Sequence, residues 1–310
     1  MESIQGIKNR SKAVKNVGQI TKAMEIVAAT KMRKAQEIAL HSRPYALRTF
    51  ELLERLSLES KISSPLMESR SIKKTLLVLV ASDKGLTGAF NTQVMRIADK
   101  FLENNKNLNF ATITIGKKTN KYALRKKLEI VGEFYGVGDY ATPDEITPIS
   151  NLIVDGFIGK KWDEVITIST NFISALKQEP IVRQILPVDI EKIRQTVKDI
   201  IPEHGRYADL AKDEIEKHFT RKTKEVEYIF EPTPEEAIKS LIPHLVKMQI
   251  YHLILEANAS EHSARRVAMK NASDNAEEIL EELTLVYNKA RQASITSELI
   301  EITSTQNALT

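Results

Sequence analysis

The chain has no cysteine among its 310 residues, which excludes disulfide bonds, thiolate metal sites and cysteine nucleophiles. Aromatic residues are scarce at 6%, and the net charge of +4 argues neither for nor against a nucleic-acid partner. No stretch approaches the roughly eighteen uncharged apolar residues that a membrane helix requires. The first residues also lack the apolar core of a secretory signal. We therefore expect a protein that is made and kept in the cytoplasm of a bacterium.

Glycine is absent from residue 233 to the end, and Pro243 is the only proline inside that stretch after Pro234. Thr233, Pro234 and Glu236 together form a helix-start signal with a capping box. The pattern predicts one helix from 233 to about 304, on the order of 100 Å long. Pro243 is expected to kink it near its start. A helix of this length must pair with another helix, cross a membrane or serve as a mechanical part.

The N-terminal region, residues 3 to about 59, is a second long helical stretch with one proline, Pro44. Spacings of three and four residues predict a coiled-coil seam at Val17, Ile20, Met24 and Val27, flanked by the small residues Ala23, Ala28, Ala29, Ala35 and Ala39. The same spacings occur in the C-terminal helix at Ile279, Leu283, Val286, Ala290, Ala293, Ser297 and Ile300. We expect the two helices to fold back on each other as an antiparallel pair.

Charge favours the same pairing. Residues 8–34 are strongly basic with a lone Glu25, whereas residues 274–282 carry Asp274, Glu277, Glu278, Glu281 and Glu282. The alternative is that both runs are only solvated helix faces, which is the usual role of charge runs.

The middle of the chain has the pattern of an α/β sheet. Short β-branched runs predict strands at 75–81, 110–115, 164–169 and 225–230, and helical stretches lie at 93–102, 117–128 and 148–160. Strands that alternate with helices indicate an open, Rossmann-like sheet. We thus expect an α/β protein with an N-terminal helix at 1–60, a Rossmann-like domain at 72–231 and a C-terminal helix at 232–310. Residues 190–224 are read as a helical insertion in that domain.

No catalytic, metal or cofactor site is predicted. The loop at 82–91 follows the first strand, where a nucleotide would bind, but it lacks the glycine spacing of nucleotide-binding fingerprints. The six histidines have no metal-ligand spacing. Two other classes stay open on residues alone. One is a nucleotide-dependent enzyme with helical arms, and the other is a DNA-binding coiled coil with a basic helix.

Both ends of the chain resemble the γ subunit family of F-type ATP synthase. The resemblance rests on residues 20–25, 27–35, 42–45, 267–275 and 285–299, the last including the run Lys289-Ala290-Arg291-Gln292-Ala293-Ser294. Looser matches occur at 83–88, 171–172, 184–187 and 228–232. Residues 190–224 are longer than the family pattern, and the tail at 302–310 lacks the glycine and alanine that the family often has there.

The resemblance implies a non-catalytic rotor shaft. The paired terminal helices would stand inside a ring of α and β subunits, and the α/β domain would form a foot on the ε subunit and the membrane c-ring. One copy would act per complex, peripheral to the cytoplasmic side of the bacterial plasma membrane. Ion flow would turn the c-ring and this shaft, and ATP would be made in the β subunits. We expect a shaft that turns in a sleeve to carry polar or small side chains on its outer face.

The resemblance also implies which residues make contacts. The expected β-subunit contacts are Lys22, Met24, Lys31, Arg33, Lys84, Gly85, Gly88, Arg291 and Gln292. The expected ε and c-ring contacts are Tyr228, Phe230 and Glu231. No cofactor and no nucleic acid is expected.

Overall fold

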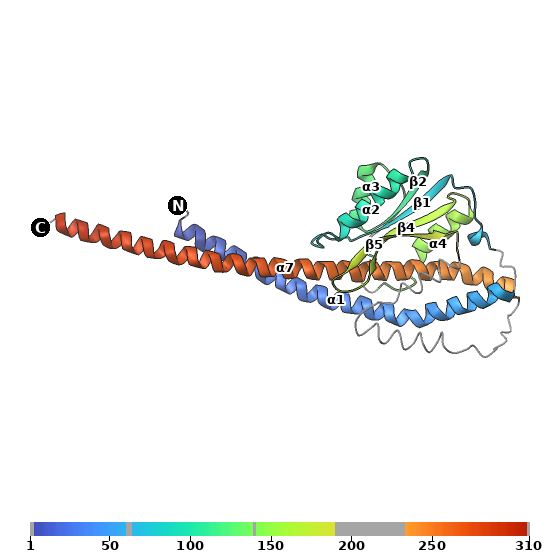
Figure 1. Cartoon of the computed structure of the whole chain (residues 1–310), viewed down its shortest axis with the longest axis horizontal. Helices are drawn as coiled ribbons and strands as arrows, with labels where there is room; N and C mark the ends of the chain where they lie inside the picture. The colour runs from blue at the N-terminus through green and yellow to red at the C-terminus, as the bar shows by residue number, and fades with distance from the viewer. Residues whose placement is uncertain (1–2, 60–63, 139–140, 190–232, 309–310) are drawn as a thin grey trace. The chain divides into compact units, whose positions relative to one another are not determined.

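The computed structural model describes residues 3–59, 64–138, 141–189 and 233–308. The chain divides into two compact units, Met1–Ala28 with Arg265–Thr310, and Ala29–Ala264. Two long helices contribute to both units, α1 (Ile4–Glu59) and α7 (Pro234–Ala308) (Figure 1). The prediction of one C-terminal helix is confirmed, and that helix continues through Pro243.

The larger unit contains a five-stranded sheet in the order β3-β2-β1-β4-β5. The strands are β1 (Lys74–Val80), β2 (Asn109–Ile115), β3 (Glu129–Phe134), β4 (Glu164–Phe172) and β5 (Gln178–Leu186). The pairs among the first four strands are parallel, whereas β5 runs antiparallel to β4. This is the Rossmann-like open sheet that the sequence predicted.

Helices cover both faces of the sheet because the central strand is apolar on both sides. Leu76 and Val78 of β1 pack in a core with α4 (Thr147–Ile158) and α7, while Leu77 and Leu79 pack with α2 (Phe90–Asn104) and α3 (Lys117–Lys126). Strands buried on both faces have near-continuous apolar sequences, which is what β1 shows. The unit is therefore three layers, with α2 and α3 on one side and α4 and α7 on the other (Figure 1).

Three of the predicted strands are confirmed as β1, β2 and β4, but β3 and β5 were not predicted. Both are edge strands of the sheet. The edge strand β3 contains Gly132, and β5 contains Pro180, residues that lower strand propensity and are tolerated at sheet edges. The predicted strand at 225–230 and the insertion at 190–224 lie outside the described residues.

The smaller unit is a pair of antiparallel helices, with the N- and C-terminal ends of the chain at the same end of the unit (Figure 1). A Cβ atom added to Gly18 would lie 3.3 Å from the Cβ of Ala276, so the two backbones approach closely there. In α1 a row spaced by three and four residues is buried or half-buried: Ile4, Ile7, Ser11, Val14, Gly18, Thr21, Glu25 and Ala28. Its counterpart in α7 is Met269, Ala272, Ala276, Leu280, Leu283, Tyr287, Ala290 and Ser294.

The predicted seam residues were wrong in α1 by one position. Val17, Ile20 and Val27 are 53%, 60% and 55% exposed, and the row that meets α7 is the adjacent one. In α7 the prediction holds for Leu283 and Ala290, whereas Ile279, Val286, Ala293, Ser297 and Ile300 are exposed. The physical reason is that Gly18 lets the two backbones approach closely at Ala276, so the row that contains Gly18 faces α7 and the neighbouring row with Val17 does not.

We predict that Gly156→Ala destabilises the larger unit. A Cβ atom there would lie 1.9 Å from a ring carbon of Trp162, which is 3% exposed and donates a hydrogen bond from Nε1 to the Ile153 carbonyl. Overpacking against a buried ring costs about 1–3 kcal/mol, which outweighs the helix propensity that alanine adds. Urea unfolding followed by fluorescence measures the loss, because Trp162 is the only tryptophan.

Gly85→Ala is the matched control, since its added Cβ would meet no atom closer than 3.9 Å. Equal stability of the two variants would show that Gly156 and Trp162 are not packed as described.

Candidate functional site

The loop after β1 occupies the place where a Rossmann-like sheet would bind a phosphate, but its own side chains fill that place. One carboxylate oxygen of Asp83 accepts a hydrogen bond from the Lys117 backbone N–H at 2.9 Å, and the other accepts from the Gly136 N–H at 2.8 Å. Lys117 is the first residue of α3. A helix N-terminus is the usual anion site of such folds, and here Asp83 is the anion bound to it.

The same loop is closed on its other side by Asn91, near the start of α2. Its carbonyl oxygen accepts from the Ser82 backbone N–H at 3.1 Å, and its amide donates to the Thr87 hydroxyl at 2.9 Å. A Cβ atom at Gly116 would lie 2.0 Å from the Ala81 carbonyl oxygen, so α3 already packs tightly against the end of β1. These contacts favour a structural loop over a nucleotide site.

The tip of this loop faces outward and is accessible to a partner. Lys84, Gly85 and Gly88 are exposed. Leu86, which lies within the predicted contact stretch between Gly85 and Gly88, is 60% exposed and has a positive φ of 63°.

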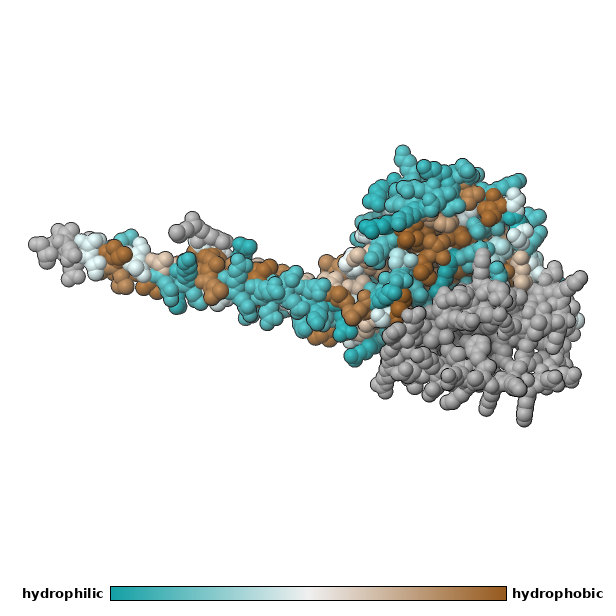
Figure 2. Space-filling model, in the orientation of Figure 1, coloured by the Kyte–Doolittle hydropathy of each residue, from teal (hydrophilic) through white to brown (hydrophobic). Residues whose placement is uncertain are grey.

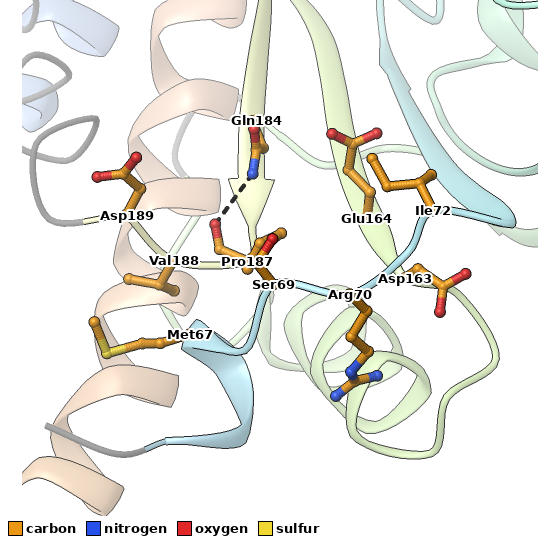
Figure 3. A pocket seen from close by; sticks show the side chains of 10 residues that line it. All are labelled: Met67, Ser69, Arg70, Ile72, Asp163, Glu164, Gln184, Pro187, Val188 and Asp189. Carbon is orange, nitrogen blue, oxygen red and sulfur yellow. Dashed lines mark hydrogen bonds between the residues drawn. The ribbon is translucent and has the colours of Figure 1, made fainter.

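A cavity of about 530 Å³ lies at the other end of the sheet, lined by residues around the starts of β1 and β4 and the end of β5 (Figure 3). Its polar side chains bind the chain itself. Arg70 donates to the Phe157 carbonyl at 3.0 Å and lies over the Phe157 ring, and one Asp163 carboxylate oxygen accepts from the backbone N–H groups of Lys73 and Lys74. Gln184 donates to the Pro187 carbonyl. These contacts stabilise the end of the sheet at which β1 and β4 begin. They leave no group of these polar side chains that points together at a substrate.

Two kinds of feature are absent from the part of the chain that the structure describes. Within it, no group of three or more histidine, aspartate or glutamate side chains has the arrangement of a metal site. Over the same residues, none of the helices is long and apolar enough to span a membrane.

The predicted contact residues on the smaller unit fall into two zones. Lys22 is exposed and Met24 half-buried on α1, and Arg291 and Gln292 are exposed on α7. Lys22 lies near Asp274 and Glu277 of α7, which are about 21–26 Å along the helix axis from Arg291. The structure therefore does not bring these two pairs of residues together. Beyond Ser294 every residue of α7 to Ser304 is exposed, so within the described residues α7 has no partner helix there.

The charge complementarity between the two helices is present at Lys22. A hydrogen bond from its ammonium group to Glu25, at 2.9 Å, is the main cause that raises the Lys22 pKa, and the negative charges of Asp274 and Glu277 add to it. The ammonium group is exposed, so this attraction adds little to the stability of the helix pair.

The remaining predicted residues are distributed as follows. Lys31 is half-buried and Arg33 exposed on the part of α1 that belongs to the larger unit. Tyr228, Phe230 and Glu231 lie outside the described residues.

A family model described as ATP synthase matches residues 3–309. The ATP synthase gamma chain of Roseiflexus castenholzii is 37% identical over 314 residues, covering 100% of this chain and 99% of the relative. That of Herpetosiphon aurantiacus is 36% identical over 320 residues, with 100% and 99% covered. The chain belongs to the ATP synthase gamma chain family. It is a non-catalytic subunit of the central stalk of F-type ATP synthase, whose catalytic sites lie in the β subunits, as the resemblance predicted.

Solved structures show the same fold. A chain of the Euglena gracilis mitochondrial ATP synthase OSCP/F1/c-ring structure has a TM-score of 0.64 at 18% identity, with 99% of this chain and 94% of that chain covered. A chain of the Tetrahymena thermophila mitochondrial ATP synthase central stalk and c-ring has a TM-score of 0.56 at 23% identity, with 82% and 99% covered.

We predict that Asp83→Ala destabilises the larger unit by about 0.5–2 kcal/mol, because two backbone N–H groups, one of them at the start of α3, lose a charged acceptor. Asp83→Asn keeps one acceptor oxygen and should lose less. Urea unfolding of both variants measures the difference. An Asp83→Ala chain as stable as the parent would show that the carboxylate does not hold this loop.

Proposed function

We propose that this chain turns with a c-ring and drives the β subunits of an α/β ring through their conformations. One copy would act per complex, and the foot would bind ε and the c-ring on the cytoplasmic side of a bacterial plasma membrane. The proposed β contacts are Lys22, Met24, Lys31, Arg33, Lys84, Gly85, Gly88, Arg291 and Gln292. The proposed ε and c-ring contacts are Tyr228, Phe230 and Glu231.

The observation that carries the proposal is the outer face of the smaller unit. Large aliphatic side chains are exposed there on both helices, and brown patches lie between teal ones along this unit in Figure 2. They are Val17, Ile20, Ile26, Val27, Ile279, Leu285, Val286, Ile295, Leu299, Ile300 and Ile302. The expectation of a polar or small outer face was wrong. Exposed aliphatic groups in such number mark surfaces that a protein partner covers, which supports a shaft enclosed in a ring.

Co-purification tests the assembly. A tagged chain, expressed in its own host, should recover α and β in excess over itself, together with ε and the c-ring. Recovery of the chain alone, or with equal amounts of one unrelated protein, would contradict the proposal.

We predict that cysteines placed at Met24 and, in a second variant, at Arg291 form crosslinks to β in the assembled complex. The chain has no cysteine of its own, so each crosslink reports one position. A cysteine at Leu124 is the matched control, because this residue is 60% exposed on α3 but outside the proposed contacts. It should form no crosslink to β. If neither Met24→Cys nor Arg291→Cys joins β under oxidising conditions, the proposed shaft contacts are wrong.

A further inference from the structure

In the larger unit, α7 is surrounded by the rest of the chain. Residues 250–257 are all buried, including the charged Glu256 and the polar His252. Most of the packing there is apolar, with Ile250, Leu253 and Ile254 in the main core. This close packing resists both separation of α7 from the sheet and rotation of α7 about its own axis, and polar contacts with fixed donor and acceptor positions add directional constraints to it.

One face of α7 is held by polar contacts from β5 and the turn before it. Arg183 of β5 forms an ion pair with Glu256 at 3.3 Å, and the two side chains are only 11% and 10% exposed. Further along α7, the Ser263 hydroxyl donates to the Ala175 carbonyl and accepts from the Gln178 side-chain amide. Glu256 and Ser263 are seven residues apart, so they lie on the same face of the helix.

The opposite face is held by the segment that follows β3. The side-chain amide of Asn258 donates to the Gly138 carbonyl at 3.0 Å, and Lys247 lies 3.6 Å from the carboxylate of Asp144. Asn258 is rotated by about 200° from Glu256 around the helix axis. Lys247 and Asn258 share a face because eleven residues make about three turns. Asp144 is exposed, so Asn258 is the stronger contact on this side.

We propose that these contacts form a rotational lock, in which Arg183 and Glu256 together with Ser263 and Asn258 prevent α7 from turning within the α/β domain. The proposal rests on the rotor function above. Torque between the foot and the shaft can pass through α7, because α7, like α1, belongs to both units. Directional contacts on opposite faces resist twist about the helix axis, because rotation in either sense distorts the hydrogen-bond geometry on both faces.

The buried ion pair is the centre of the lock for an energetic reason. Removing one partner leaves a buried, unpaired charge, whereas replacing both by apolar residues of similar volume is often neutral for folding. A pair kept for fold stability alone is therefore replaceable, while a pair kept for its geometry is not. This difference separates the two roles by experiment.

The test uses the whole complex reconstituted in vesicles, with ATP hydrolysis and ATP-driven proton pumping measured together. The variant Arg183→Met with Glu256→Leu should assemble, keep its thermal stability and hydrolyse ATP, but pump fewer protons per ATP. We expect the ratio of protons pumped to ATP hydrolysed to fall below that of the parent chain. The reversed pair, Arg183→Glu with Glu256→Arg, should recover pumping.

Lys74 and Glu129 form an exposed ion pair at 2.8 Å and provide the control, Lys74→Met with Glu129→Gln, which should pump at the parent ratio. The lock is overturned if the double apolar variant pumps at the parent ratio. It is also overturned if that variant fails to assemble, because the pair is then needed for folding. Failure of the unmodified chain to assemble would instead overturn the rotor function.

Discussion

The continuity of α7 is the constraint on which the rest of the structure depends. The helix has 75 residues and belongs to both units of the chain. A force applied at one end can reach the other only if no residue between them lets the backbone swivel, and glycine, the residue most able to do so, is absent throughout. The proline inside the helix, Pro243, lies near its start, between the core residues Ile242 and Leu245, and the helix continues through it.

This one helix presents two kinds of surface. Around Glu256 it is buried on all sides and held by polar contacts on opposite faces. Around Ala276 it contacts α1 through a narrow row that includes small residues and leaves its remaining faces open. The first surface suits a permanent attachment. The second leaves exposed aliphatic groups such as Leu285 and Ile295 for contacts with partners that change during each turn.

The sequence predicted much of the fold, because long glycine-poor helices and β-branched buried strands carry strong local signals. The prediction missed β5, because Pro180 lowers the strand propensity of that edge strand. It also chose the wrong seam in α1, because Val17 is more hydrophobic than Gly18, whereas Gly18 is the residue that approaches α7 closely. The contact between Arg183 and Glu256 joins residues that are 73 positions apart. No sequence pattern connects residues at that separation, so the contact could not be predicted. The two hydrogen bonds that Asp83 accepts in the 82–91 loop could not be predicted either. They depend on how the segment after β3 and the start of α3 come together in space.

The most direct test of the paired helices is a disulfide between Gly18→Cys and Ala276→Cys in the otherwise cysteine-free chain. A Cβ atom at residue 18 would lie 3.3 Å from that of residue 276, close to the roughly 3.5–4.5 Å that a disulfide needs. The account predicts that the disulfide forms readily in the assembled complex and leaves ATP synthesis intact, because both cysteines belong to one rotating body. Failure to form it, or its formation just as readily from Val17→Cys with Ala276→Cys, would contradict the pairing of the two helices.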